Sequence, residues 1–159
     1  MEGYWVVKDK GFSLIELIIV LVLIGLSLSL VTPSLSRFSK TIELRAAAKN
    51  VSGLLRYFRS EAVQKGRVYQ VLFDPDLREI RTRGLELAEE RGNKYTLPDG
   101  VQMREMKIPS SQYPSDFPTI EFYPNGGSNG GSVLLGSQDH KGYRIKVHFL
   151  TGMVEVEEG

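Results

Sequence analysis

Residues 12–31 read FSLIELIIVLVLIGLSLSLV, and Glu16 is the only charged side chain between positions 12 and 32. As an α-helix this stretch would extend about 30 Å, which is the thickness of the hydrocarbon core of a bilayer. Every face of such a helix is apolar, and a chain of 159 residues has no core large enough to surround it. The sequence therefore predicts a transmembrane helix segment over residues 12–33, with one folded domain after it.

A secretory signal peptide is the rival interpretation of an apolar N-terminal stretch. Its apolar region is shorter, usually ~7–15 residues, and small residues at the cleavage site follow it closely. In this chain the first alanine is Ala46, so residues 46–48 could form such a site only far beyond the apolar run and inside a helical pattern. The membrane segment is therefore favoured.

Glu16 is the anomaly of this segment. A carboxylate in an apolar helix costs about 2.5–3.5 kcal/mol on insertion scales, and such a residue usually has a functional partner. Glu16 is also close to the start of the apolar run, where water at the membrane surface could hydrate it. Position alone leaves both interpretations open.

The residues before and after Glu16 form a longer motif, Lys10-Gly11-Phe12-Ser13-Leu14-Ile15-Glu16-Leu17. This motif resembles the class III signal of type IV pilins and of the pseudopilins of type II secretion. The resemblance implies that a prepilin peptidase cuts between Gly11 and Phe12 and so removes a leader peptide, residues 1–11. It also implies N-methylation of Phe12 and a role for Glu16 in assembly.

The predicted cut suggests what Glu16 could do, because it would create an ammonium group on Phe12. If Glu16 of one subunit neutralises the Phe12 amine of its neighbour, assembly pairs two charges at the edge of the membrane. Such a pair would also set the axial stagger between subunits.

Gly25 and Pro33 lie where many pilins have a glycine and a proline. Both residues weaken a helix. They are candidates for a helix bend, and ordinary tolerance in a membrane helix is the alternative interpretation.

The rest of the chain predicts an α+β, pilin-like fold in which a long N-terminal helix packs on an antiparallel β-sheet. The helix is expected from about Ser13 to Lys65, with Gly66 as its cap and a membrane-spanning half followed by an amphipathic half. The apolar stripe of the second half is Leu35, Phe38, Ile42, Ala46, Val51, Leu54, Leu55, Phe58 and Ala62. Beyond Gly66 the pattern indicates strands over residues 67–73, 78–83, 101–108, 119–123, 132–135, 143–150 and 153–157.

Further short motifs narrow the resemblance. Glu61-Ala62, Phe73-Asp74-Pro75, residues 122–126 (FYPNG) and Thr151-Gly152 are similar to the H-type minor pseudopilins of type II secretion and the related FimT-type minor pilins, the GspH/FimT family. The resemblance implies a structural subunit of the periplasmic pseudopilus that drives protein export. A FimT-type minor pilin of a type IV pilus, serving pilus assembly or DNA uptake, is the alternative.

The same resemblance implies a location and a set of partners. The chain would be a single-pass protein of the bacterial inner membrane, with its C-terminal domain, residues 34–159, in the periplasm. The flanking charges are too balanced to give this orientation independently. The implied partners are the other pseudopilins, both major and minor, the prepilin peptidase, the inner-membrane assembly platform and the membrane itself.

Nothing in the sequence predicts an enzyme, a cofactor or a metal site. Cysteine is absent, which excludes disulfides and thiol chemistry, and no serine, histidine and acid cluster is recognisable. Asp74 and Asp76 could offer oxygen ligands to calcium, but the pattern favours a role for both in forming a turn. The segment 125–132 (NGGSNGGS) lacks the lysine–serine pair of a phosphate-binding loop, so we expect a flexible surface loop.

The charge pattern argues against nucleic acid as a partner. The formal net charge is only +1, and the C-terminal segment contains Glu155, Glu157 and Glu158, which repel phosphate. DNA-binding members of the FimT group typically carry arginines in that tail. A basic patch could still form elsewhere, from Arg56, Arg59 and Arg67.

Overall fold

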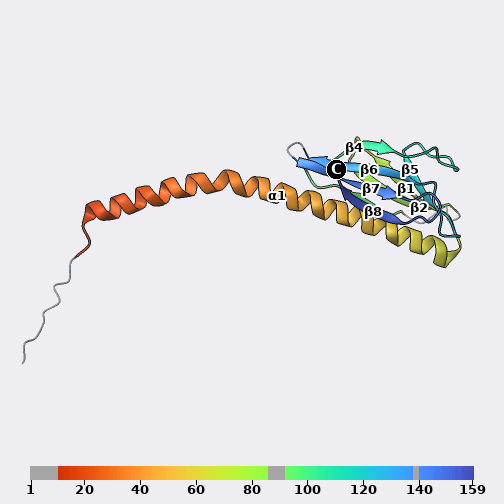
Figure 1. Ribbon diagram of the computed structural model, residues 1–159, viewed down its shortest axis with the longest axis horizontal. Coiled ribbons are helices and arrows are strands. Elements are labelled where there is room, and N and C mark those ends of the chain that lie inside the picture. Colours follow the sequence, from red (N-terminus) through yellow and green to blue (C-terminus); the bar gives the residue numbers. More distant parts are fainter. Residues whose placement is uncertain (1–10, 86–91, 138–139) are drawn as a thin grey trace, which may run out of the picture. The chain divides into compact units, whose positions relative to one another are not determined.

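The structure is a computed structural model of the chain, and it describes residues 11–85, 92–137 and 140–159. Of residues 28–39, 140 and 141 only the backbone is described. The predicted leader, residues 1–11, therefore lies outside the described residues except for Gly11. The chain divides into two compact units, one ending at Phe38 and one running from Ser39 to Gly159 (Figure 1).

One helix, α1 (Leu14–Lys65), belongs to both units. At its start the carbonyl oxygen of Ser13 accepts hydrogen bonds from the amides of Glu16 (3.1 Å) and Leu17 (3.2 Å). At its end Gly66 has a positive φ of 64°, and the amide of Arg67 donates to the carbonyl of Ala62 at 3.2 Å. This is the Schellman arrangement, which satisfies carbonyls that the helix leaves free. The expected boundaries, Ser13 to Lys65, are confirmed to within one residue.

The backbone is helical at Gly25 and at Pro33, and at Pro33 the structure describes the backbone alone. Among the described residues, no helix is both long and apolar enough to cross a membrane. The predicted segment 12–33 includes positions beyond 27 whose side chains are not described. The division into residues 1–11, 12–33 and 34–159 stays a prediction.

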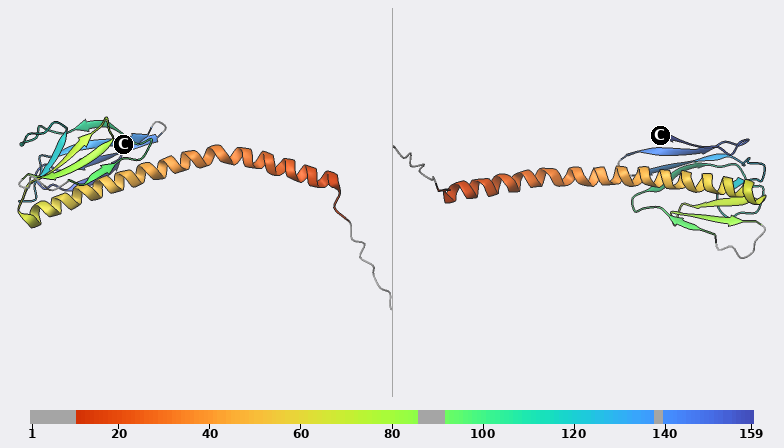
Figure 2. Two further views of the ribbon diagram at one scale, coloured as in Figure 1. Left: turned by 180° about the vertical axis from the view of Figure 1, so that it is seen from behind. Right: turned by 90° about the horizontal axis from the view of Figure 1, so that it is seen from below.

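The second unit combines the later part of α1 with two antiparallel sheets of four strands each. Sheet A has the order β3 (Lys94–Thr96), β2 (Glu79–Gly84), β1 (Tyr69–Asp74) and β5 (Thr119–Phe122). Sheet B has the order β4 (Gln102–Lys107), β6 (Gly131–Ser137), β7 (His140–Val147) and β8 (Val154–Glu158). Figure 2 shows the helix between strands of the two sheets.

The seven expected strands are all present, with ends shifted by a few residues. Three features differ from the expectation: the strands form two sheets, β3 is an additional strand, and β7 stops at Val147 rather than Leu150. The last difference arises because the amide of His148 donates to the carbonyl of Met153 at 2.9 Å, which turns the chain toward β8.

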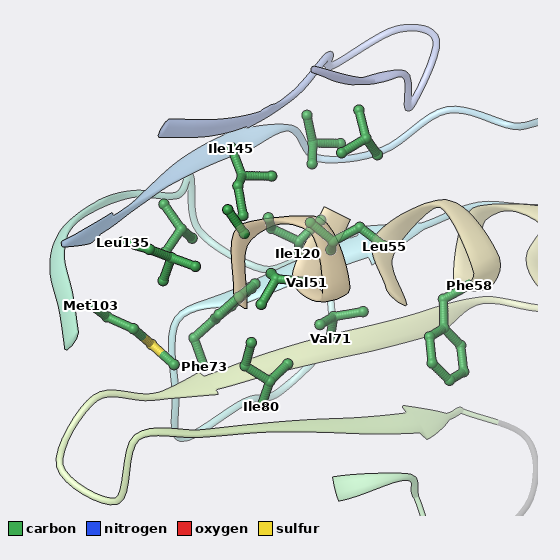
Figure 3. Packing of buried hydrophobic residues seen from close by; sticks show 14 of the residues in the cluster. Val51, Leu55, Phe58, Val71, Phe73, Ile80, Met103, Ile120, Leu135 and Ile145 are labelled. Carbon is green, nitrogen blue, oxygen red and sulfur yellow. The ribbon is translucent and has the colours of Figure 1, made fainter. Parts of the chain in front are cut away.

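The hydrophobic core lies where α1 meets both sheets. Figure 3 shows Val51 and Leu55 of the helix among Val71 and Phe73 of sheet A and Ile145 of sheet B. Among the described side chains of the helix, the buried apolar residues are Leu44, Ala47, Ala48, Val51, Leu55, Phe58 and Ala62, and Ser52 is buried beside them.

The expected apolar stripe was wrong at two positions. Ile42 is 52% exposed, and Ala46 is exposed as well. The buried seam recurs every three or four residues from Leu44, and positions two residues before or after Leu44 are rotated by about 200° around the helix. They therefore face away from the sheets.

We predict that a fragment beginning at Ser39 folds alone, because it retains the whole core. Circular dichroism should show mixed helix and strand with one cooperative thermal transition. Replacing Leu55 with aspartate should unfold the fragment, because it buries an unpaired charge. The matched change Tyr57→Asp, on an exposed side chain, should leave the spectrum intact. A random-coil spectrum for the unchanged fragment would contradict the single-domain interpretation.

Candidate assembly site

In the part of the N-terminal unit whose side chains are described, residues 11–27, the large apolar side chains are exposed on every face of the helix. Phe12 is 76% exposed, and the side chains that follow it in α1 are similarly open. The exposed large apolar residues are Phe12, Leu14, Ile15, Leu17, Ile18, Ile19, Val20, Leu21, Val22, Leu23, Ile24 and Leu26. An apolar surface of this size is normally buried, either against lipid or against other helices.

Glu16 lies in the first turn of α1, among these apolar side chains. A negative charge there interacts favourably with the helix dipole. No other described residue forms an ion pair or side-chain hydrogen bond with its carboxylate. The carboxylate is therefore available to a group from outside the described chain.

The peptide between Gly11 and Phe12 is exposed and precedes the helix. An exposed, non-helical backbone is the form in which a peptide bond can enter a peptidase. A Cβ atom added to Gly11 would meet nothing within 4 Å, and the same holds for Gly25. Among the described residues, then, no contact requires glycine at either position.

The segment 125–132 is not the flexible surface loop that its composition suggests, because residues 126–130 are buried. The Nε atom of Arg59, on α1, donates hydrogen bonds to the carbonyls of Gly126 (3.2 Å) and Thr151 (2.8 Å). Gly152 has a φ of +60°, and a Cβ there would lie 2.5 Å from the Gly126 carbonyl oxygen. The segments 122–126 and 151–152, which were quoted as family motifs, are thus both bound by Arg59.

The arginines that could form a basic patch have structural partners. The guanidinium of Arg56 donates to the carbonyl of Val154 at 3.0 Å, Arg59 binds the two loops, and Arg67 also interacts within the chain. The contacts of Arg56 and Arg59 hold the later part of α1 against β8 and the loops next to sheet B.

Asp74 forms a turn, as expected. Its side chain is buried, accepts a hydrogen bond from the Leu77 amide at 3.0 Å and pairs with Arg81 at 3.3 Å. Within the described parts of the chain, no group of three or more acidic or histidine side chains could hold a metal ion.

Sheet A contains a buried carboxylate that was not expected from the sequence. Glu121, in β5, is 0% exposed. It accepts five hydrogen bonds: from the side chains of Gln70 (2.9 Å), Ser111 and Tyr123 (3.0 Å), and from the amides of Gln112 (3.0 Å) and Tyr113 (3.1 Å). Three of these donors belong to the loop 109–118, which Glu121 therefore ties to the sheet.

The environment of Glu121 acts on its pKa in two opposing ways. Burial raises the pKa, whereas the hydrogen bonds from Ser111, Gln70 and the two loop amides lower it, and the net shift is downward. Burial, followed by the hydrogen bond donated to Glu121, raises the pKa of Tyr123 to about 12. Glu121 is thus a buried anion at neutral pH.

Two family models match the chain. Residues 7–32 match the prokaryotic N-terminal methylation motif, and residues 47–151 match the type II transport protein GspH. This chain belongs to the GspH family. The first match includes Gly11, Phe12 and Glu16, and the second covers the folded domain from the buried part of α1 to the β7–β8 turn.

Similar proteins agree with the GspH assignment. Type II secretion system protein H of Xanthomonas campestris pv. campestris is 30% identical over 145 residues, which cover 91% of this chain and 81% of that protein. The chain is therefore a GspH-type minor pseudopilin of type II secretion, and the predicted family and its role in secretion are confirmed. The family consists of structural subunits.

Solved structures confirm the α+β pilin-like fold. The minor pseudopilin EpsH from the type 2 secretion system of Vibrio cholerae has a TM-score of 0.58 at 18% identity, covering 73% of this chain and 97% of that chain. The type IV minor pilin FimU of Pseudomonas aeruginosa also has a TM-score of 0.58 at 18% identity, covering 76% and 92%.

Proposed function

We propose that this GspH-type pseudopilin is made with a leader, is cut between Gly11 and Phe12, and is N-methylated at Phe12. The mature chain then spans the inner membrane once, with residues 34–159 in the periplasm. There it serves as a structural subunit of the pseudopilus that drives protein export. Its partners are the prepilin peptidase, the assembly platform and the other pseudopilins.

The observation that carries this proposal is the exposed apolar segment with an acid, Glu16, in its first turn that no other described side chain pairs with. Apolar side chains on every face suit lipid before assembly and neighbouring helices after it. A carboxylate in that setting requires a positive partner, and a cut after Gly11 supplies one, the Phe12 amine of a neighbouring subunit.

A type IV pilus subunit is the alternative, since the likeness in fold to FimU equals the likeness to EpsH. A role in DNA uptake would need basic side chains gathered on one surface and open to phosphate. Arg56 and Arg59 instead hold backbone carbonyls of the same chain. This use of the two arginines favours the secretion assignment.

Co-expression with a prepilin peptidase should shorten the chain by residues 1–11, and mass analysis should find a methylated Phe12 at the new N-terminus. Gly11→Leu should block the cut without changing the fold, because a side chain at Gly11 meets nothing within 4 Å. Gly53→Leu is the matched control, since Gly53 is equally unobstructed, and it should be processed normally. A mature N-terminus near Lys49 would instead show conventional signal-peptide cleavage and refute the proposal.

A further inference from the structure

The turn between β7 and β8 carries three large apolar side chains that the rest of the described chain leaves uncovered. Phe149, Leu150 and Met153 are 63%, 74% and 55% exposed. The backbone of this turn is nevertheless fixed by hydrogen bonds, from the amide of His148 to Met153 (2.9 Å) and from the amide of Gly152 to His148 (2.8 Å).

Neighbouring segments hold the turn from behind. The amide of Ser128 donates to the carbonyl of Phe149 at 3.0 Å, and Arg59 donates to the carbonyl of Thr151 at 2.8 Å. Gly130, with a φ of +75°, approaches so closely that a Cβ would lie 3.2 Å from the Cα and Cβ of Phe149. The exposed side chains therefore stand on a prearranged backbone, which lowers the entropy cost of binding a partner.

Phe149 and Met153 border an open groove of about 390 Å³ on sheet B. Its charged lining comes from one row across the sheet, in which Lys107 pairs in register with Ser132, Ser132 with Lys146, and Lys146 with Glu155. Side chains at paired positions lie on the same face. The groove thus has an apolar wall, formed by Phe149 and Met153, and a charged row across the sheet. The row is basic at Lys107 in β4 and at Lys146 in β7, and acidic at Glu155 in β8.

Charge decides which segment the groove can accept. The Lys107 ammonium is held by Glu105 at 2.8 Å, and the Lys146 ammonium by Glu157 at 2.6 Å. Each ammonium has three N–H donors, so each can bind a further carboxylate. Glu155 repels a carboxylate at the β8 end. The complementary segment has a large apolar side chain against Phe149 and Met153 and an acidic side chain toward Lys107.

We propose that this β7–β8 docking surface (Lys107, Ser132, Lys146, Phe149, Met153 and Glu155) binds such an apolar and acidic segment of a different subunit of the same filament. The inference rests on the proposed function, because it takes the partner from the assembly that the chain enters. The contact joins folded domains and is separate from the pairing of Glu16 with a Phe12 amine.

The absence of cysteine from the chain allows a direct test in membranes that contain the full set of pseudopilins. Met153→Cys and Leu77→Cys place single thiols at two positions that are each 55% exposed, one on the docking surface and one on the β1–β2 turn. A thiol-specific cross-linker should join Met153→Cys to another pseudopilin. Leu77→Cys should give at least about tenfold less of that product.

Further changes test the chemistry of the contact. Added to Met153→Cys, either Phe149→Ser or Lys107→Glu should reduce the product about tenfold or more, whereas Lys107→Arg should retain it. Raising the salt concentration should weaken the contact, because exposed charges are screened.

Three results would overturn the docking surface: equal products from both thiols, a product made only of two copies of this chain, or a product only with a secreted protein. Leu17→Cys, in the N-terminal segment, separates this failure from failure of the proposed function. If Leu17→Cys still cross-links to other pseudopilins while Met153→Cys does not, only the docking surface is wrong. If neither thiol cross-links to a pseudopilin, the proposed assembly fails as well.

Discussion

Glu16→Ala is expected to abolish assembly while leaving membrane insertion and leader removal intact. Removing a carboxylate from an apolar segment makes insertion easier by about 2.5–3.5 kcal/mol, and the proposed cut follows Gly11 and does not involve Glu16. In the assembled filament, however, the neighbour's Phe12 amine would enter apolar surroundings without a partner. Breaking a buried ion pair costs about 3–5 kcal/mol, which corresponds to a loss in association of roughly 100-fold or more. Cross-linking to other pseudopilins and a secretion assay measure this loss.

Three variants separate pairing from other effects of the substitution. Glu16→Gln retains the shape without the charge and should fail to assemble as well. The double change Glu16→Ala with Leu17→Glu moves the charge around the helix by about 100° and should not restore assembly. Glu43→Ala removes an exposed acid outside the apolar segment and should assemble normally. Normal cross-linking and secretion by Glu16→Ala would show that Glu16 is a hydrated surface residue and that the pairing mechanism is wrong.

The elements of the fold that follow local rules could be predicted from the sequence. The end of α1 was evident because Gly66 supplies the left-handed residue of a helix cap. The β1–β2 hairpin was evident because Asp74 can bond the Leu77 amide and so close a turn. The site motif, Gly11, Phe12 and Glu16, was also local, and the roles of its residues stay predictions.

Features decided by contacts between distant segments could not be predicted. The partition of the strands into two sheets depends on pairings such as β1 with β5. The helical period allowed Ile42 on the buried face, and only the position of the sheets excludes it. The composition of residues 125–132 suits both a mobile loop and a tightly packed one, and the contacts with Arg59 decide between them.

Glu121 could not be recognised for the same reason, since its partners come from β1 and from the loop 109–118. We predict that Glu121→Leu lowers the free energy of unfolding by roughly 3–4 kcal/mol. The variant removes the acceptor of five hydrogen bonds, which come from Gln70, Ser111, Tyr123 and two backbone amides. A buried unsatisfied donor costs about 1–3 kcal/mol. Denaturant unfolding of the fragment that begins at Ser39 measures the loss.

Glu157→Leu is the matched control for this change. Glu157 is also a strand glutamate, but it is exposed and pairs with Lys146 on the surface. Surface ion pairs contribute about 0–1 kcal/mol, so this variant should unfold close to the unchanged fragment. An equal loss from both variants would show that Glu121 contributes no more than a surface charge.

Acid should remove the contribution of Glu121 in a defined direction. The folded state lowers the pKa of Glu121, whereas an unfolded glutamate titrates near ~4.3. The stabilisation is therefore fully present above ~4.3 and is lost as the pH falls through the lower, folded pKa. Other carboxylates behave in the same way: hydrogen bonds from Lys107 and then Arg144 lower the pKa of Glu105 to about 2.

The difference in unfolding free energy between the unchanged fragment and Glu121→Gln isolates Glu121 from Glu105, because both proteins retain Glu105. That difference should be constant from pH 7 to about pH 5 and shrink below the unfolded pKa of ~4.3. If burial outweighed the hydrogen bonds, Glu121 would be neutral in the folded state and its folded pKa would be raised. The difference in unfolding free energy would then grow as the pH falls. Growth of the difference below pH 5 would therefore contradict the charged network, and the loop 109–118 would then be held by a protonated carboxyl group.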